Sequence, residues 1–142
     1  MRLALQEAEM AAEAGEIPVG AVLTCNDKLI AKAHNQTEQL NDATAHAEMM
    51  VLTSGMSALS SKYLPDCNLY VTLEPCIMCA GAIGLSQIKS LHFAASDEKR
   101  GYHLYEGKIL HPKTKVFTGL YESESAEMLK AFFKARRKHQ GK

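Results

Sequence analysis

The stretch that most constrains how this chain can fold is residues 71–82, with the sequence VTLEPCIMCAGA. It begins with an apolar run typical of a buried strand, and Glu74-Pro75 ends that strand because proline cannot donate to a sheet ladder. A helix rich in small residues follows, with Cys76 and Cys79 at its start. A three-residue spacing places both sulfur atoms on one helix face, about 5–6 Å apart at Cβ. The stretch therefore predicts a strand–loop–helix unit that presents two neighbouring thiols.

The position of these cysteines favours metal binding. The free N–H groups of a helix start, together with the positive end of its dipole, favour thiolate over thiol. Thiolates with this spacing are common zinc ligands, but a CxxC between a strand and a helix also fits a thioredoxin-like dithiol. On this motif alone both interpretations stay open.

A third ligand has to come from elsewhere, and the segment TAHAE at residues 44–48 supplies a candidate. Thr44 is a plausible N-cap for a helix that runs to about Gly55, which places His46 and Glu48 in the first turn. Residues two apart do not share a face of a regular helix, so this pair depends on the looser geometry of a helix end.

Three protein ligands (His46, Cys76 and Cys79) would leave one position of a tetrahedral zinc ion open, which is the pattern of a catalytic site. Glu48 beside the open position could act as a general base toward a water that the metal activates. A fourth protein ligand, for which Cys67 or His34 is available, would make the site structural instead.

Length and composition indicate an ordinary globular protein. A chain of 142 residues suits a single domain, residues 1–142. Sixteen basic and sixteen acidic residues give no net charge, so nucleic-acid binding would depend on where the charges lie. We expect no signal peptide and no membrane association, because no apolar run approaches the roughly 20 residues of a span. Four cysteines in a chain of this size suggest no disulfide framework, and a cytoplasmic location follows as the expectation.

Hydrophobic periodicity and turn residues predict a mixed order of elements. We expect helices at residues 2–14, 44–55, 77–85 and 125–138, and strands at residues 19–25, 28–33, 67–73, 88–95 and possibly 115–121. Residues 96–114 are the least regular part. The order argues for an α/β fold in which a mixed sheet is covered on both faces.

The joint pattern of HAE and, thirty residues later, PCIMC resembles the signature of the zinc-dependent cytidine/deoxycytidylate deaminase superfamily. The resemblance extends to PVGAV at residues 18–22, to Asn35, to SDEKRG at residues 96–101 and to the closing FFKARR. Over nearly the whole chain these segments are similar to the bacterial tRNA-specific adenosine deaminases.

This resemblance implies a three-layer α/β/α fold with a five-stranded mixed sheet, cytidine deaminase-like, in a homodimer whose sites are completed across the interface. It implies one Zn²⁺ per subunit on His46, Cys76 and Cys79, with Glu48 as proton shuttle. The implied reaction converts the wobble adenosine of a tRNA anticodon stem-loop to inosine. The substrate contacts carried over are Asn35, Ala47, Pro75 and Asp97.

Two alternatives remain at this stage: a deaminase of a free base or nucleoside of the guanine or cytidine type, and a non-catalytic zinc-stabilised RNA-binding protein. One departure concerns the substrate. The resembled family has a turn rich in Gly, Ala and Ser after the Asp97 position, whereas this chain continues with KRGYHLYEGKILHPKT. Its Tyr102, His103 and Tyr105 could stack on bases or could simply pack.

The end of the chain is basic. Residues 130–142 contain six Lys or Arg and no Asp or Glu. Such a run is compatible with a solvated helix end and with phosphate contacts, and contacts to phosphate would make RNA binding depend on salt.

Overall fold

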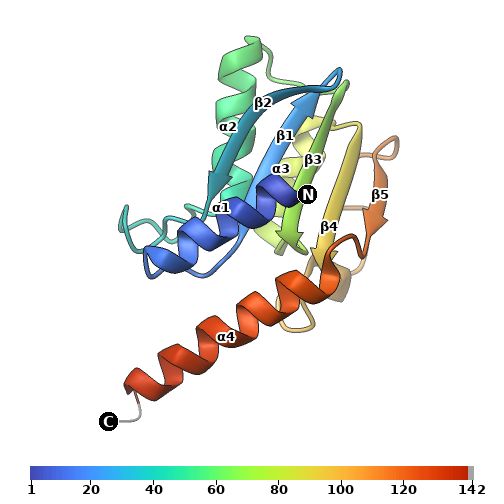
Figure 1. Ribbon diagram of the computed structural model, residues 1–142. Coiled ribbons are helices and arrows are strands. Elements are labelled where there is room, and N and C mark those ends of the chain that lie inside the picture. The colour runs from blue at the N-terminus through green and yellow to red at the C-terminus, as the bar shows by residue number, and fades with distance from the viewer. Residues whose placement is uncertain (141–142) are drawn as a thin grey trace.

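The computed structural model describes residues 1–140, in which helices and strands alternate in the predicted order (Figure 1). The elements are α1 (Arg2–Glu13), β1 (Gly20–Cys25), β2 (Lys28–His34), α2 (Ala47–Leu59), β3 (Cys67–Leu73), α3 (Ile77–Ser86), β4 (Ser90–Ala95), the 3-10 turn η1 (Tyr102–Leu104), β5 (Lys115–Thr118) and α4 (Glu122–Gln140).

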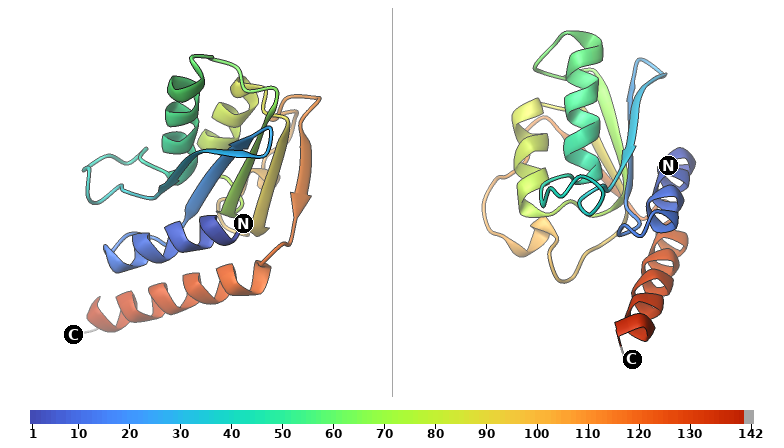
Figure 2. Two further views of the ribbon diagram at one scale, coloured as in Figure 1. Left: turned by 45° about the horizontal axis from the view of Figure 1, so that its top comes forward. Right: turned by 90° about the vertical axis from the view of Figure 1, so that its left-hand side faces the viewer.

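The five strands form one mixed sheet in the order β2-β1-β3-β4-β5. β1 pairs antiparallel with β2 and β3, whereas β3, β4 and β5 run parallel. Figure 2 shows the sheet edge-on, with α2 and α3 on one face and α1 and α4 on the other. The three-layer α/β/α architecture with a five-stranded mixed sheet is therefore confirmed. No helix within residues 1–140 is both long enough and apolar enough to span a membrane.

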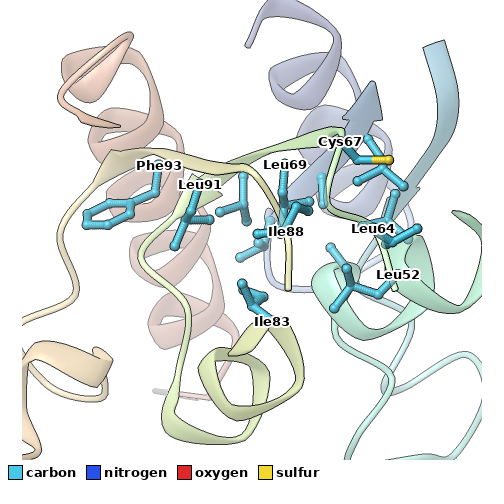
Figure 3. Packing of buried hydrophobic residues seen from close by; sticks show 14 residues of the cluster. Leu52, Leu64, Cys67, Leu69, Ile83, Ile88, Leu91 and Phe93 are labelled. Carbon is cyan, nitrogen blue, oxygen red and sulfur yellow. The ribbon is translucent and has the colours of Figure 1, made fainter. Parts of the chain in front are cut away.

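The main core lies between the sheet and the α2–α3 layer (Figure 3). Leu23, Leu69 and Leu91 come from three neighbouring strands and are fully buried, and they face Val51 of α2 and Ile83 of α3. Full burial of a side chain of this size contributes about 1.5–3 kcal/mol. The core therefore fixes how the first turns of α2 and α3 sit at one end of the sheet.

Several boundaries differ from the sequence prediction. Thr44 is not the N-cap of α2, because its side chain bonds to Asp42 and the cap residue is His46. The helix also runs on to Leu59, since Gly55 packs against β1 rather than ending the helix. α3 begins at Ile77 as predicted, with Cys76 as its N-cap, and ends at Ser86, one residue later than predicted.

The predicted hairpin turn is confirmed, whereas the last strand and the last helix differ in their bounds. The β1–β2 turn uses Asn26 and Asp27, both with positive φ, as a two-residue hairpin requires. β5 is shorter than predicted, and α4 begins three residues earlier than predicted. Residues 96–114 contain no regular element longer than η1.

Candidate active site

Two helix starts meet at the end of the sheet where β3 stops. His46 is the N-cap of α2 and Cys76 is the N-cap of α3, and both have extended backbone conformations. Cys79 follows in the first turn of α3 and is fully buried. Cap residues lie half outside the helix, so their side chains can turn toward the axis end rather than along the helix face. This position explains how His46 can share a site with Glu48, two residues further on.

The three predicted ligands converge. His46 Nδ1 lies 3.6 Å from Cys76 Sγ and 3.5 Å from Cys79 Sγ. The three donor atoms all lie within 4.8 Å of one another. Zinc bonds of 2.0–2.1 Å to nitrogen and 2.3 Å to sulfur in a tetrahedron would separate the two donors by about 3.6 Å. The chemistry and spacing of these residues fit a metal ion.

Neither candidate for a fourth protein ligand belongs to this cluster. Cys67 is buried at the opposite end of β3, and His34 Nδ1 lies 3.1 Å from Glu7 Oε1. In the described part of the chain the three-residue cluster is thus the one group of His, Cys, Asp and Glu with metal-ligand spacing. An open fourth position, as in a catalytic site, is consistent with this geometry.

Hydrogen bonds within the cluster shift the pKa values of its two thiols in opposite directions. The Cys79 thiol donates to Cys76, which with His46 lowers the pKa of Cys76 to about 4. The same hydrogen bond, with burial, raises the pKa of Cys79. The contact with Cys76 also raises the pKa of His46. Cys76 therefore favours the thiolate form, whereas Cys79 and His46 hold their protons more strongly than the free side chains do, and a metal has to displace those protons when it binds.

Glu48 lies beside the cluster at the second residue of α2 and is 4% exposed. Burial raises the pKa of its carboxyl to about 7. A carboxyl with this pKa can accept a proton near neutral pH and give it up again, as a general acid–base catalyst must.

A cavity of about 540 Å³ opens over these residues. His46, Glu48 and Cys76 line its inner end. One side is formed by residues 37–43 and the other by residues of the segment after β4, and the wall residues are Thr37, Glu38, Asn41, Asp42, Ala43, Asp97 and Arg100. The cavity is therefore a pocket between two loops with the candidate metal centre at its base.

A second cavity, of about 620 Å³, adjoins the first. The two share Ile17, Leu73, Asp97 and Arg100. The second is bordered by Lys99 of the same loop and by one face of α4, which contributes Leu129, Lys130, Phe133 and Arg137. The combined hollow leads from the candidate metal centre to a basic and apolar groove.

The four residues predicted to contact substrate occupy different positions. Asn35 lines the first cavity, and its Oδ1 accepts a hydrogen bond of 2.9 Å from the Ala47 N–H. Ala47 and Pro75 are fully buried and do not line either cavity. Asp97 lines both cavities. Its Oδ1 accepts hydrogen bonds from the backbone N–H groups of Lys99 and Arg100. Asn35 and Asp97 are thus brought to the cavity, and Ala47 and Pro75 are not.

The three aromatic residues after Gly101 have separate roles. Tyr102 is half-buried and packs edge-on against Phe93, with 6.3 Å between ring centroids. The His103 ring contacts the Glu74 carboxylate at 2.7 Å. Tyr105 is 51% exposed. The packing interpretation therefore describes Tyr102, whereas His103 is exposed but held by Glu74, and Tyr105 is exposed to solvent.

Lys130 and Arg137 from the basic end of the chain lie seven residues apart on the groove-lining face of α4. Arg136 instead lies 3.8 Å from Glu38, and its guanidinium sits over the Phe132 ring. Lys142 was counted in the basic run but lies outside the described residues. Part of the run thus faces the groove beside the candidate active site.

Two buried carboxylates at the site were not anticipated. Glu16 is 1% exposed and Glu74 is 3% exposed, and each accepts hydrogen bonds from one of the two cavity walls. The sequence does carry a signal for both carboxylates, in the segments EIPVG and TLEPC. In each, an acidic residue stands one or two positions before a proline at the edge of an apolar strand. Such a carboxylate is buried with the strand end and needs donors from elsewhere.

Comparison with known proteins places the chain among deaminases. The family model of the MafB19-like deaminases matches residues 1–137. The tRNA-specific adenosine deaminase of Agrobacterium fabrum is 45% identical over 142 aligned residues, which cover 96% of this chain and 93% of that protein. A solved structure from a study of A-to-I editing by tRNA:A34 deaminases at the wobble position of transfer RNA superimposes with a TM-score of 0.85 at 45% identity, covering 91% of this chain and 97% of that one.

The guanine deaminase of Nitrosomonas europaea shares the fold, with a TM-score of 0.79 at 23% identity over 92% of this chain and 81% of that one. Fold, cluster and family model together define the class of protein as a hydrolytic deaminase of the cytidine deaminase-like fold. The chain belongs to the family of the tRNA-specific adenosine deaminases, as its resemblance predicted.

Proposed function

We propose that this chain deaminates adenosine to inosine at the wobble position of a tRNA anticodon loop. The observation that carries the proposal is the convergence of His46, Cys76 and Cys79 beside the buried carboxyl of Glu48, at the base of a cavity. Relatives that share nearly the full length of the chain are named for this activity. The reaction consumes one water and releases ammonia.

The cofactor we propose is one Zn²⁺ per subunit, held by His46, Cys76 and Cys79. Two thiolates and an imidazole are ligands that zinc prefers, and the distances from His46 Nδ1 to the two sulfur atoms fit its tetrahedral geometry. Bound zinc supplies the Lewis acidity that makes water a competent nucleophile near neutral pH. The helix starts of α2 and α3 offset the excess negative charge of two thiolates, because the positive ends of both dipoles face the site.

Glu48 is proposed to move the protons of the reaction. Its carboxylate takes a proton from the attacking water as the new C–O bond forms at C6 of adenine. It then delivers a proton to the departing amino nitrogen, so that ammonia leaves and the carboxylate is restored. A pKa of about 7 suits both transfers, since neither the acid nor the base form is scarce at neutral pH.

The RNA would lie along the two joined cavities. A base turned out of the anticodon loop fits the inner cavity, where Asn35 and Asp97 offer polar groups. The groove beyond it is lined by Lys99, Lys130 and Arg137, whose positive charges suit contacts to the phosphates of a single strand. Exposed Tyr105 could stack on a neighbouring base.

We further propose a cytoplasmic homodimer. Large apolar side chains stand exposed along α3 and the segment that follows β4, namely Ile77, Leu85 and Leu104. A second copy covering this face would remove apolar surface from water. Size-exclusion chromatography with light scattering should then give twice the mass of the 142-residue chain.

The test is inosine formation in an anticodon stem-loop that carries a wobble adenosine, compared with free adenosine, cytidine and guanine under the same conditions. We expect product from the stem-loop and none from the free compounds. Turnover of free guanine alone would reject the tRNA substrate in favour of a free-base deaminase, and RNA binding without turnover would indicate a non-catalytic zinc protein.

A further inference from the structure

The wall formed by residues 96–105 has little regular structure, yet it borders both cavities. Its contribution to the cavity surface consists of polar and charged side chains, among them Asp97, Lys99 and Arg100. A segment of this kind loses conformational entropy when it is ordered, and it needs fixed contacts to the rest of the fold to hold its side chains in place.

The contacts converge on Glu74, the last residue before Pro75 at the end of β3. Its Oε1 accepts from the Asp97 N–H at 3.0 Å, and its Oε2 accepts from the His103 N–H at 2.9 Å. The His103 ring nitrogen Nδ1 lies 2.7 Å from Oε2. One carboxylate thus joins two points of the wall that are 23 and 29 residues away in the chain.

The surroundings show that this carboxylate is built into the fold. The Glu74 side chain is 1% exposed, so its charge depends on these donors for compensation. Gly101 packs directly on it, and an added Cβ there would overlap the carboxylate. Tyr102 N–H donates to the Pro75 carbonyl at 3.0 Å, and Gly101 forms a bridge with Cys76, so the wall is joined to the chain segment that carries a metal ligand.

We propose that Glu74 is a positioning residue for the RNA substrate: it holds residues 96–105 so that Asp97, Lys99 and Arg100 face the two cavities. Glu74 lines the inner cavity but not the outer groove, and its hydrogen bonds act on the groove through the wall. Glu16 performs the corresponding task for the opposite wall, where it accepts from the Glu38 and Gln39 N–H groups at 3.0 and 2.8 Å. The inference rests on the proposed function for the identity of the substrate.

The experiment compares the full-length zinc-loaded protein with Glu74→Gln, which keeps the shape but replaces one acceptor oxygen by a donor that faces an N–H. We expect KM for the anticodon stem-loop to rise about tenfold, as loss of a hydrogen bond to a charged group implies, with kcat changed far less. Amide hydrogen exchange at residues 97 and 103 should accelerate while α2 and β3 stay protected and zinc content is unchanged. Glu74→Asp should recover part of the affinity.

Gly101→Ala provides a second route, because the added Cβ would overlap the Glu74 carboxylate and the Asp97 carbonyl and so displace the wall without removing the charge of Glu74. It should reproduce the rise in KM. Glu106→Gln, an exposed acid further along the chain, is the matched control and should leave KM unchanged. The proposal is overturned if Glu74→Gln leaves KM and the exchange at residues 97 and 103 unchanged, or if it releases zinc and accelerates exchange throughout the molecule. Absence of stem-loop turnover in the wild-type protein would instead reject the proposed function, and the exchange measurement does not depend on turnover.

Discussion

The metal-ligand cluster and the wall formed by residues 96–105 border the same cavity, but they are held in different ways. The cluster sits on two helix starts that the hydrophobic core fixes to the sheet. The wall has almost no regular structure and depends on hydrogen bonds to Glu74 and Pro75. The proposed chemistry would therefore lie on the rigid elements, whereas the proposed contact with a large substrate would lie on a segment that a few polar contacts order.

The largest effect should come from Glu48→Gln. This substitution keeps the size of the side chain but removes its ability to exchange a proton, so we expect kcat to fall by about 10³-fold, within the range of general acid–base catalysis. Zinc content and stem-loop affinity should stay near those of the wild type. Single-turnover inosine formation measures the effect, and retained turnover would remove Glu48 from the proton-transfer step.

Cys76→Ser should weaken the cluster and leave the wall intact. An alcohol is a poor zinc ligand at neutral pH, so zinc affinity should fall by more than the roughly 10–100-fold that loss of a hydrogen-bond partner of a metal ligand costs. Metal analysis after dialysis against a weak chelator gives the occupancy. Cys25→Ser, at a cysteine outside the cluster, is the matched control. Full occupancy in Cys76→Ser would exclude this residue as a ligand.

Metal binding should also depend on pH in a defined direction. The contact with Cys76 raises the pKa values of His46 and Cys79, so both groups hold their protons to higher pH than the free side chains do, and a metal must displace those protons. Zinc affinity should therefore increase as pH rises, by up to about tenfold per unit for each proton released. Competition titrations between pH 6 and 8 would measure the slope, and a slope of zero would contradict this distribution of protons.

The smallest effect concerns the groove. Replacing Lys130 and Arg137 by Ala should weaken stem-loop binding and reduce the salt dependence of the logarithm of the binding constant by about 1.4, since each contact to single-stranded phosphate contributes about 0.7. Deleting residues 136–142 should flatten the slope in the same direction. Lys28→Ala, in the β1–β2 hairpin far along the chain from the groove, serves as control. An unchanged slope would assign these cations to ordinary solvated surface.

The sequence predicted the rigid region better than the wall. Apolar runs and the Asn26-Asp27 turn were sufficient for the sheet, and the HAE and PCxxC patterns were sufficient for the metal cluster, because each depends on short-range spacing. The cap assignment at Thr44 was wrong because the Asp42 carboxylate binds that hydroxyl, and local preference for serine or threonine caps does not reveal such a competitor.

The wall could not be predicted in the same way. The contacts of Glu74 join residues more than twenty positions apart, and no local pattern marks their partners. Tyr102 and His103 carry the side chains expected of a base-stacking surface, yet one packs on Phe93 and the other binds Glu74. Their environment is set by tertiary structure, which composition alone does not specify.

The most direct test of the central claim is X-ray absorption spectroscopy at the zinc edge on the purified, zinc-loaded protein. We predict two sulfur neighbours at about 2.3 Å, one imidazole nitrogen at about 2.0–2.1 Å and one light atom that does not come from the protein. A shell of four protein ligands, or one with fewer than two sulfur atoms, would contradict a catalytic metal held by His46, Cys76 and Cys79.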